Sequence, residues 1–125
     1  MRVLLLEPNQ PLGQVYMTAL TQAGHEPIYV TSAQTAVRAM DEQTPDVIVL
    51  ELQLVGHSGI EFLYELRSYP EWQHIPVVLH SMVSASTLGE QAAQLQELGV
   101  VVHLYKPATT LRKLLQAVND YAPVS

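Results

Sequence analysis

Charged side chains follow three of the apolar runs in this chain. Glu51 comes directly after the run at residues 47–50, Glu7 comes directly after the run at residues 3–6, and the last run leads into Lys106. A sheet of parallel strands gathers the carboxyl ends of its strands at one edge, where functional sites of such sheets lie. We therefore expect two carboxylates and one ammonium group to meet at one rim.

Short apolar runs alternate with amphipathic patterns along the whole chain. The helical patterns repeat apolar residues every three or four positions, and the run at residues 47–50 has no polar alternation, which is typical of a strand buried on both faces. Short connections favour right-handed βαβ crossovers and a doubly wound sheet. The predicted strands lie at residues 3–6, 27–30, 47–50, 77–79 and 100–104, and the five predicted helices at residues 12–20, 33–40, 60–66, 88–95 and 111–118.

Turn and cap residues set the ends of these helices. Pro11 suits the first turn of the first helix, in which Leu12, Val15, Tyr16, Ala19 and Leu20 repeat at helical spacing, and Gly24 ends it. Thr31 or Ser32 is the expected N-cap of the second helix, and the fourth helix is expected to end at Gly99.

Composition indicates one globular domain, residues 1–125. The chain has a mass of 13.9 kDa, is 48% hydrophobic and contains no cysteine. This length buries a core without disulfides or metals, and the absence of thiols agrees with a reducing cytoplasm, where we expect the protein to act.

Charge and hydropathy exclude two classes of partner. With a net charge of −6 and six Lys and Arg residues, the chain lacks the basic face that nucleic acids require. No apolar run approaches the length of about 20 residues that spans a membrane, and no signal peptide is recognisable. We expect no direct nucleic-acid binding and no membrane association.

Four sequence motifs are informative together: residues 3–7, residues 45–51 with the turn at 56–59, residues 75–81, and the pair Lys106-Pro107. With these motifs, the chain resembles a response-regulator receiver domain of bacterial two-component signalling, over essentially its whole length. The resemblance implies a flavodoxin-like α/β fold, with a five-stranded parallel sheet of order 2-1-3-4-5 and five helices. It also implies an aspartate that accepts a phosphoryl group from a histidine kinase, beside a Mg²⁺ ion held by acids after the first strand.

Two departures from the family pattern bear on phosphorylation. Glu51 occupies the phospho-acceptor position, where one extra methylene displaces the carboxylate by about 1.5 Å, enough to slow in-line transfer severely. Glu7 is followed by Pro8, which offers no side-chain oxygen where the family has a second acid. The backbone carbonyl of Gln53 corresponds to the third family ligand, but it cannot rescue the Mg²⁺ site alone. We expect no metal and no other cofactor.

Three further positions match the family's switching residues. Ser81 corresponds to the hydroxyl that contacts the phosphoryl group and Lys106 to the lysine that approaches it, although both could bond Glu51 directly. His103 stands where the family carries a Tyr or Phe that turns inward on activation. In the family the bond between the matching lysine and proline is cis, and the sequence permits this for Lys106-Pro107.

The sequence is therefore interpreted as a degenerate receiver that is not an enzyme and acts by protein contact. Its charged Glu51 partly imitates a phosphorylated aspartate. We expect a signalling protein or a second copy to bind the face built from the fourth helix, fifth strand and fifth helix. Besides His103, this face includes Gln91, Gln94, Tyr105, Arg112 and Gln116.

Two alternatives stay open at this point. One is an active phosphorelay receiver with unusual geometry. The other is a flavodoxin-like binder of a small ligand that uses Glu7, Gln53 and His80, with His80 otherwise expected to be a hydrogen-bonded core or rim residue. The chain ends at Ser125, which fits either a complete small protein or the front of a longer regulator.

Overall fold

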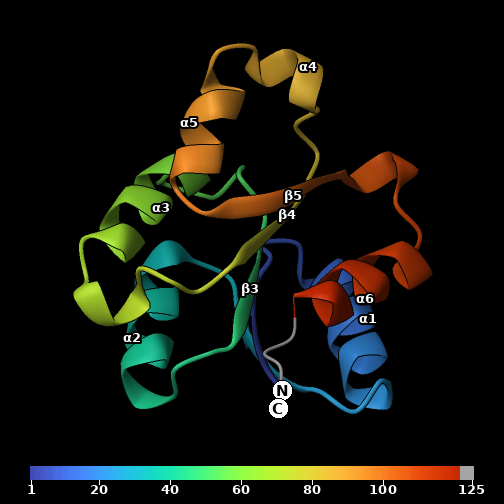
Figure 1. Cartoon of the computed structure of the whole chain (residues 1–125). Coiled ribbons are helices and arrows are strands. Elements are labelled where there is room, and N and C mark those ends of the chain that lie inside the picture. The colour runs from blue at the N-terminus through green and yellow to red at the C-terminus, as the bar shows by residue number, and fades with distance from the viewer. Residues whose placement is uncertain (122–125) are drawn as a thin grey trace.

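Five parallel strands form one sheet in the order β2-β1-β3-β4-β5 in the computed structural model, which describes residues 1–121 (Figure 1). Neighbouring strands pair in parallel throughout, for example Leu6 of β1 with Leu50 of β3. The expected flavodoxin-like fold, with a parallel sheet of order 2-1-3-4-5, is confirmed. The strands are β1 (Arg2–Leu6), β2 (Glu26–Val30), β3 (Val47–Leu50), β4 (Val77–Ser81) and β5 (Val100–Tyr105).

Helices cover both faces of this sheet. Helices α1 (Gln10–Gln22) and α6 (Leu111–Asp120) pack on one face, and the remaining helices pack on the other (Figure 1). The latter are α2 (Ala33–Glu42), α3 (Gly59–Arg67), α4 (Ala85–Leu88) and α5 (Gln91–Glu97), and the 3₁₀ turns η1 (Pro70–Trp72) and η2 (Lys106–Ala108) complete the fold.

The expected fourth helix is two helices, so five predicted helices become six. Gly89 separates α4 from α5 with a φ of +54°, outside the helical region. Glycine adopts this conformation without the steric cost that a side chain would bring. The apolar positions Leu88 and Leu95 are buried as the pattern predicted, but they lie on different helices.

The core consists of two apolar layers, one on each face of the sheet. All four residues of β3 are at most 1% exposed, as its continuous apolar run predicted. In β1, Val3 and Leu5 join the layer under α1 and α6, whereas Leu4 and Leu6 join the opposite layer. The residue that follows each strand lies at the carboxyl edge of the sheet, where the chain turns toward a helix.

Side-chain caps begin most of the helices. Ser32, the second of the two proposed residues, caps α2 through the backbone amide of Thr35, and Pro11 lies in the first turn of α1 as expected. The apolar pattern of α1 divides between two faces. Tyr16 is buried, whereas Leu12 is 37% exposed and Val15 is 47% exposed. Across the described residues, no helix has the length and hydrophobicity to cross a membrane.

Candidate functional site

Four adjacent strands place four polar side chains together at the carboxyl edge. Glu7 follows β1, Glu51 follows β3, Ser81 ends β4 and Lys106 follows β5. Glu7, Glu51 and Ser81 are at most 3% exposed as residues, and the Lys106 side chain is 8% exposed. The strand order β1-β3-β4-β5 puts the Glu51 strand between those of Glu7 and Ser81. The convergence expected from the sequence is therefore present and is buried.

The Lys106 ammonium group bridges the two carboxylates. Its Nζ donates to Glu7 Oε1 at 2.6 Å and to Glu51 Oε1 at 2.8 Å. Burial alone would lower the pKa of Lys106, but the hydrogen bonds and charges of Glu51 and Glu7 outweigh it, and this pKa is raised. The ammonium group thus stays charged, and it compensates the two acids in a site with little water to screen them.

Both oxygens of Glu51 are fully engaged by donors. Oε1 accepts from Lys106 and from the backbone N–H of Met82 at 3.0 Å. Oε2 accepts from the Ser81 hydroxyl and from the backbone N–H of Gln53 at 3.1 Å. Burial raises the pKa of Glu51, but the bonds from Lys106, Ser81 and the two amides outweigh it, so that this pKa lies below its ordinary value. Glu51 is a fixed, satisfied carboxylate anion.

Glu7 is fixed by residues that the sequence analysis did not single out. Its Oε2 accepts from the backbone N–H of Asn9 at 3.0 Å, and its backbone carbonyl accepts from the Tyr29 hydroxyl at 2.9 Å. Gly13 makes room for Tyr29, because a Cβ at this position would lie 2.3 Å from the tyrosine ring. Nothing in the spacing of these residues indicates the contact, which arises from the packing of α1 against β2.

The residues of this pocket do not fit a Mg²⁺ ion. The facing carboxylate oxygens of Glu7 and Glu51 are already joined by the Lys106 ammonium, and Pro8 supplies no ligand. Mg²⁺ requires octahedral coordination by oxygen, usually with carboxylates free to face it. Within residues 1–121 no cluster of three or more His, Cys, Asp or Glu side chains could hold a metal ion.

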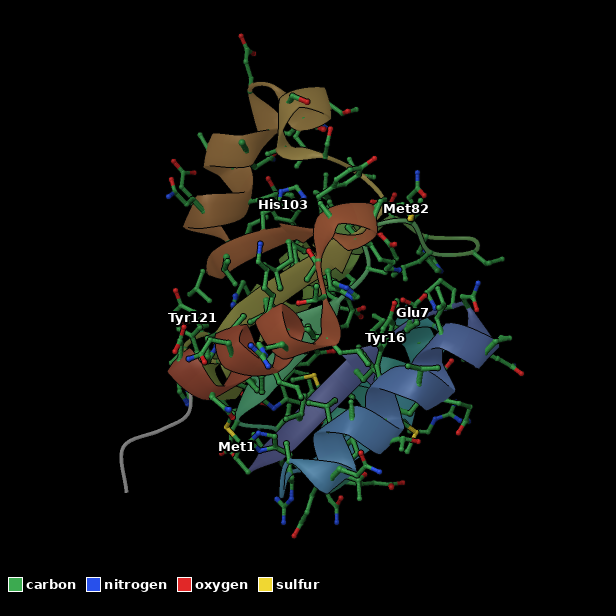
Figure 2. All side chains as sticks on the ribbon, turned by 90° about the vertical axis from the view of Figure 1, so that its right-hand side faces the viewer. Met1, Glu7, Tyr16, Met82, His103 and Tyr121 are labelled. Carbon is green, nitrogen blue, oxygen red and sulfur yellow. The ribbon has the colours of Figure 1, made fainter. Side chains whose placement is uncertain are left out.

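A chain of hydrogen bonds leads from the pocket to His103. The Ser81 hydroxyl, which donates to Glu51, accepts from the backbone N–H of Val83 at 3.0 Å. The carbonyl of Val83 is 2.7 Å from His103 Nε2, which must donate because a carbonyl only accepts. The His103 ring is half-buried and lies against the loop after β4 (Figure 2). The peptide bonds of the described chain are all trans, including Lys106-Pro107.

His80 lies on the other side of β4 from the α4 region, against α1. It is 3% exposed, and its ring meets the edge of Tyr16 with centroids 4.9 Å apart and an interplanar angle of 81°. Burial, reinforced by the charge of Lys106, lowers the pKa of His80 to about 4. His80 is therefore a neutral aromatic residue of the core.

The residues of the expected partner face are spread over α5, β5 and α6. Tyr105 is 41% exposed, and Gln91 and Arg112 are also exposed. Gln94 donates instead to the Tyr64 hydroxyl on α3, and Gln116 donates to Asp120 Oδ1 at 2.8 Å along its own helix. Tyr105 is the large apolar side chain that this set offers to a partner.

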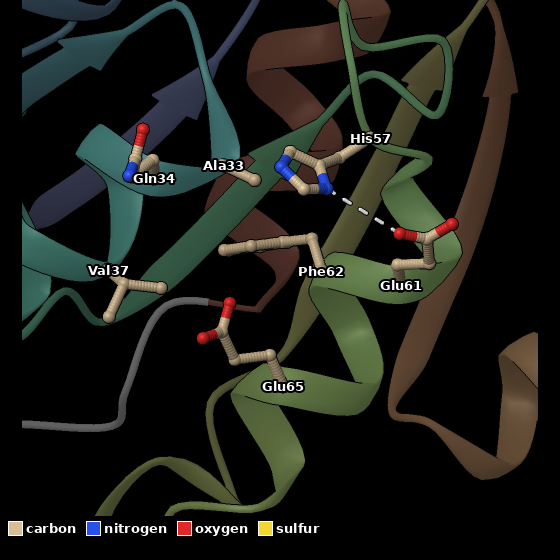
Figure 3. A pocket seen from close by; sticks show the side chains of 7 residues that line it. All are labelled: Ala33, Gln34, Val37, His57, Glu61, Phe62 and Glu65. Carbon is tan, nitrogen blue, oxygen red and sulfur yellow. Dashed lines mark ion pairs between the residues drawn. The ribbon is translucent and has the colours of Figure 1, made fainter.

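Two surface grooves lie near the pocket but do not reach it. One, of about 470 Å³, is lined by Gln53 and the turn before α3, and it includes neither Glu7 nor His80. The other, of about 400 Å³, runs between α2 and α3. In Figure 3 the His57–Glu61 ion pair and Glu65 stand at this second groove over the buried Phe62. No ligand at either groove would touch the bridged carboxylates.

Comparison with known proteins returns one family. The family model described as "Response regulator receiver domain" matches residues 3–119. The chain is 31% identical over 106 residues to the phosphate regulon transcriptional regulatory protein PhoB of Escherichia coli K12, covering 85% of this chain and 45% of PhoB. The chain thus spans about half the length of the first curated relatives it matches. It is also 25% identical over 119 residues to the polar-differentiation response regulator DivK of Brucella ovis, covering 95% of this chain and 94% of DivK.

The solved structures agree on the fold. The receiver domain of the sensor histidine kinase PA1611 of Pseudomonas aeruginosa PAO1, which has a magnesium ion coordinated in its active site cleft, superposes with a TM-score of 0.83 at 22% identity, covering 96% of this chain and 95% of that one. CheY4 of Vibrio cholerae superposes with a TM-score of 0.84 at 19% identity, covering 96% of this chain and 97% of that one.

Proposed function

Because this chain belongs to the response regulator receiver domains, we propose that it is a receiver held in one state, which signals by protein contact without accepting a phosphoryl group. It acts as one unit over residues 1–125, and it is not an enzyme. The observation that carries this proposal is that the Glu51 carboxylate is already fully hydrogen-bonded. Lys106, Ser81 and two backbone amides donate to it.

The donors around Glu51 correspond to the groups that the family resemblance assigns to the phosphoryl group. The hydroxyl of Ser81 and the ammonium of Lys106 would contact a phosphoryl oxygen, but here both contact Glu51 itself. A phosphodonor would have to displace both, and it would meet a carboxylate displaced by about one C–C bond from the family position. Phosphoryl transfer depends on the positioning of the phosphoryl group and on stabilisation of its charge. Here the groups that would do both, Ser81 and Lys106, are bonded to the Glu51 carboxylate.

A metal ion would not restore the reaction. Lys106 joins the two carboxylates that a Mg²⁺ ion would need, and its pKa is raised, which keeps its proton in place. We therefore propose that the ammonium group takes over the charge compensation that a divalent cation supplies in phosphorylatable receivers. The result is a pocket that is independent of Mg²⁺ and of phosphodonors.

Glu51 imitates part of an acyl phosphate. It brings one charge and two oxygens, whereas a phosphorylated side chain brings about two charges and three oxygens. The imitation extends to the switch position, because the Ser81 hydroxyl accepts from the Val83 amide and the Val83 carbonyl accepts from the half-buried His103. A signalling protein would recognise the resulting arrangement around Tyr105, on the face that also carries Gln91, Gln94, Arg112 and Gln116.

The test combines a phosphodonor with a neutral variant. Wild-type protein is incubated with acetyl phosphate and Mg²⁺ and examined by intact mass spectrometry, and we expect no added phosphoryl group. In parallel, Glu51→Gln removes the charge, and we expect the NMR amide signals of Met82 and Val83 to move, because their bonds depend on Glu51 and Ser81. The same substitution at the exposed Glu61 is the matched control, and its effects should stay at α3 and at His57, the partner of Glu61 in the turn before α3.

Two results would contradict the proposal. A labile phosphoryl adduct on Glu51 would mean that the pocket is an active acceptor. Amide signals of Met82 and Val83 that stay in place in Glu51→Gln would mean that the carboxylate does not hold the loop after β4.

A further inference from the structure

The groove between α2 and α3, which we call the α2–α3 groove, has an apolar base and an acidic rim. Its base is formed by Ala33 and Val37 of α2 and by Phe62 of α3, and its volume is about 400 Å³. Figure 3 shows Phe62 pointing toward α2, with His57 on one side of it and Glu65 on the other. A long basic side chain has the complementary composition, with an apolar stem and a charged head. The groove therefore offers both kinds of contact that such a side chain makes.

Two glutamates of α3 supply the negative charge of the rim. Glu61 and Glu65 lie one helical turn apart, and both are exposed. Glu61 Oε2 lies 3.6 Å from His57 Nδ1. Within residues 1–121, the Glu65 carboxylate has no ion-pair partner. A cation that bound Glu65 from outside would therefore break no ion pair of the protein.

The α2–α3 groove lies in the most acidic part of the surface. Apart from Arg38, the exposed Asp, Glu, Lys and Arg residues on and beside α2, α3, η1 and α5 are all acidic. Arg67 ends α3, but its guanidinium group donates to the backbone carbonyls of Trp72, Ile75 and Leu98 at 2.6 to 2.7 Å. The acids are Asp41, Glu42, Glu61, Glu65, Glu71, Glu90 and Glu97. This side of the molecule attracts a cationic partner and repels a second copy of net charge −6.

The turn before α3 holds one end of the groove in place. Ser58 accepts from the backbone N–H of Glu61 at 3.1 Å and so caps α3, and it pairs with Gln53 in an isolated antiparallel bridge. The backbone N–H of Gly59 donates to the carbonyl of Leu52 at 2.7 Å. Groups that are ordered before binding lower the entropic cost of binding. The α2–α3 groove is preorganised in this sense.

We infer that the α2–α3 groove binds a basic segment of a partner protein, with one arginine side chain of that segment lying in the groove. The aliphatic stem of this arginine packs against Val37 and Phe62, and its guanidinium group binds the Glu65 carboxylate. Arginine fits better than lysine, because its planar fork donates two parallel hydrogen bonds to one carboxylate. None of the residues that line the groove belongs to the face around Tyr105, so this is a second contact site.

A peptide titration followed by the amide NMR signals of the protein tests this inference. The probe is the capped pentapeptide Lys-Ala-Arg-Ala-Lys, and the amide signals of Val37, Phe62 and Glu65 should shift until they saturate. A second peptide carries citrulline, which has the same shape as arginine but no charge, in place of the central arginine. It keeps both lysines, so the two peptides differ only in the central guanidinium group. We expect the citrulline peptide to bind about fivefold more weakly, the effect of losing one partly exposed ion pair.

Three variants locate the binding site. Glu65→Gln should weaken binding of the arginine peptide about fivefold, for the same reason. Val37→Ser should weaken it about threefold, because the arginine stem loses an apolar contact. The matched control is Glu90→Gln, the same change as at Glu65 but at an exposed acid beside the start of α5, and it should bind like wild type. Circular dichroism checks that each variant is folded.

Several results would overturn the inference. Shifts that spread evenly to Asp41, Glu90 and Glu97 would mean that the acidic side attracts cations without a defined site, and so would equal binding of the two peptides. If spermidine shifted the Val37 and Glu65 signals at lower concentration than the peptide, the ligand would be a free polyamine. If these signals moved with protein concentration alone, a second copy would occupy the groove. No readout uses a phosphodonor or changes the bridged carboxylates, so the inference and the proposed function can fail separately.

Discussion

The buried neutral His80 makes the stability of this protein sensitive to mild acid. Its pKa is lowered from 6.5 to about 4, by burial first and by the Lys106 charge second, with Glu51 acting in the opposite direction. In the unfolded chain the imidazole takes up a proton as the pH falls through 6.5, whereas in the folded protein it stays neutral until about pH 4. Protonation therefore favours the unfolded state throughout this window, and stability falls as the pH falls.

The size of the effect follows from the two pKa values. Each unit of difference between the folded and unfolded pKa is worth about 1.4 kcal/mol, so the range from 6.5 to about 4 corresponds to about 3 kcal/mol in total. Lowering the pH from 7 to 5 realises about 2 kcal/mol of it. Glu51 does not add to this loss, because its pKa lies below the ordinary value of 4.5 and it stays ionised in this range.

Urea denaturation at pH 7 and at pH 5 measures this loss. The variant His80→Phe keeps an aromatic ring against the edge of Tyr16 but cannot take up a proton. We expect wild type to lose about 2 kcal/mol more free energy of unfolding than His80→Phe between the two pH values. An NMR titration of the His80 ring should give a midpoint near pH 4. Equal losses in the two proteins, or a ring midpoint near 6.5, would refute the reasoning.

Two further predictions concern the ammonium bridge at Lys106 and the close packing at Gly59. Lys106→Met leaves two buried carboxylates without their cation and should lower the free energy of unfolding by about 3–5 kcal/mol at pH 7. Adding Glu51→Gln to this variant should recover part of the loss in urea denaturation. A double variant no more stable than Lys106→Met alone would contradict the bridging role of Lys106. Gly59→Ala should lower thermal stability by about 1–3 kcal/mol, because its Cβ would lie 2.7 Å from the Leu52 Cα; an unchanged melting temperature would show that α3 tolerates the displacement.

The fold was predictable from the sequence because its signals are local and mutually consistent. The apolar run of β3, the short connections and the N-cap serine of α2 each indicated their element, and the strand order followed from the family resemblance. The break between α4 and α5 was missed because Leu88 and Leu95 keep one helical spacing across it. Only the backbone at Gly89 shows that the helix does not continue.

The site was predictable only as a set of positions. That Glu7, Glu51 and Lys106 would converge followed from strand ends meeting at one edge, and the structure brings them together. Which carboxylate oxygen accepts from each donor depends on side-chain geometry, which the spacing of residues along the sequence does not determine. The contact of Tyr29 with Glu7, for which Gly13 makes room, is of the same kind, since it joins two elements through their packing.

The two departures from the family pattern have a common physical consequence. The longer side chain at position 51 lets one carboxylate accept from both Lys106 and Ser81, the two groups that the family resemblance assigns to a phosphoryl oxygen. Proline at position 8 removes a further negative charge, so that the single Lys106 ammonium group bridges two carboxylates, Glu7 and Glu51, without a third acid beside them. An aspartate at position 51 alone would undo only the first change, because the pocket would still lack the second acid beside Glu7. We therefore expect Glu51→Asp to release the Ser81 hydroxyl from residue 51 while Lys106 stays bound to Glu7. Mg²⁺-dependent phosphorylation should not return, because it would require replacing Pro8 by an acid as well.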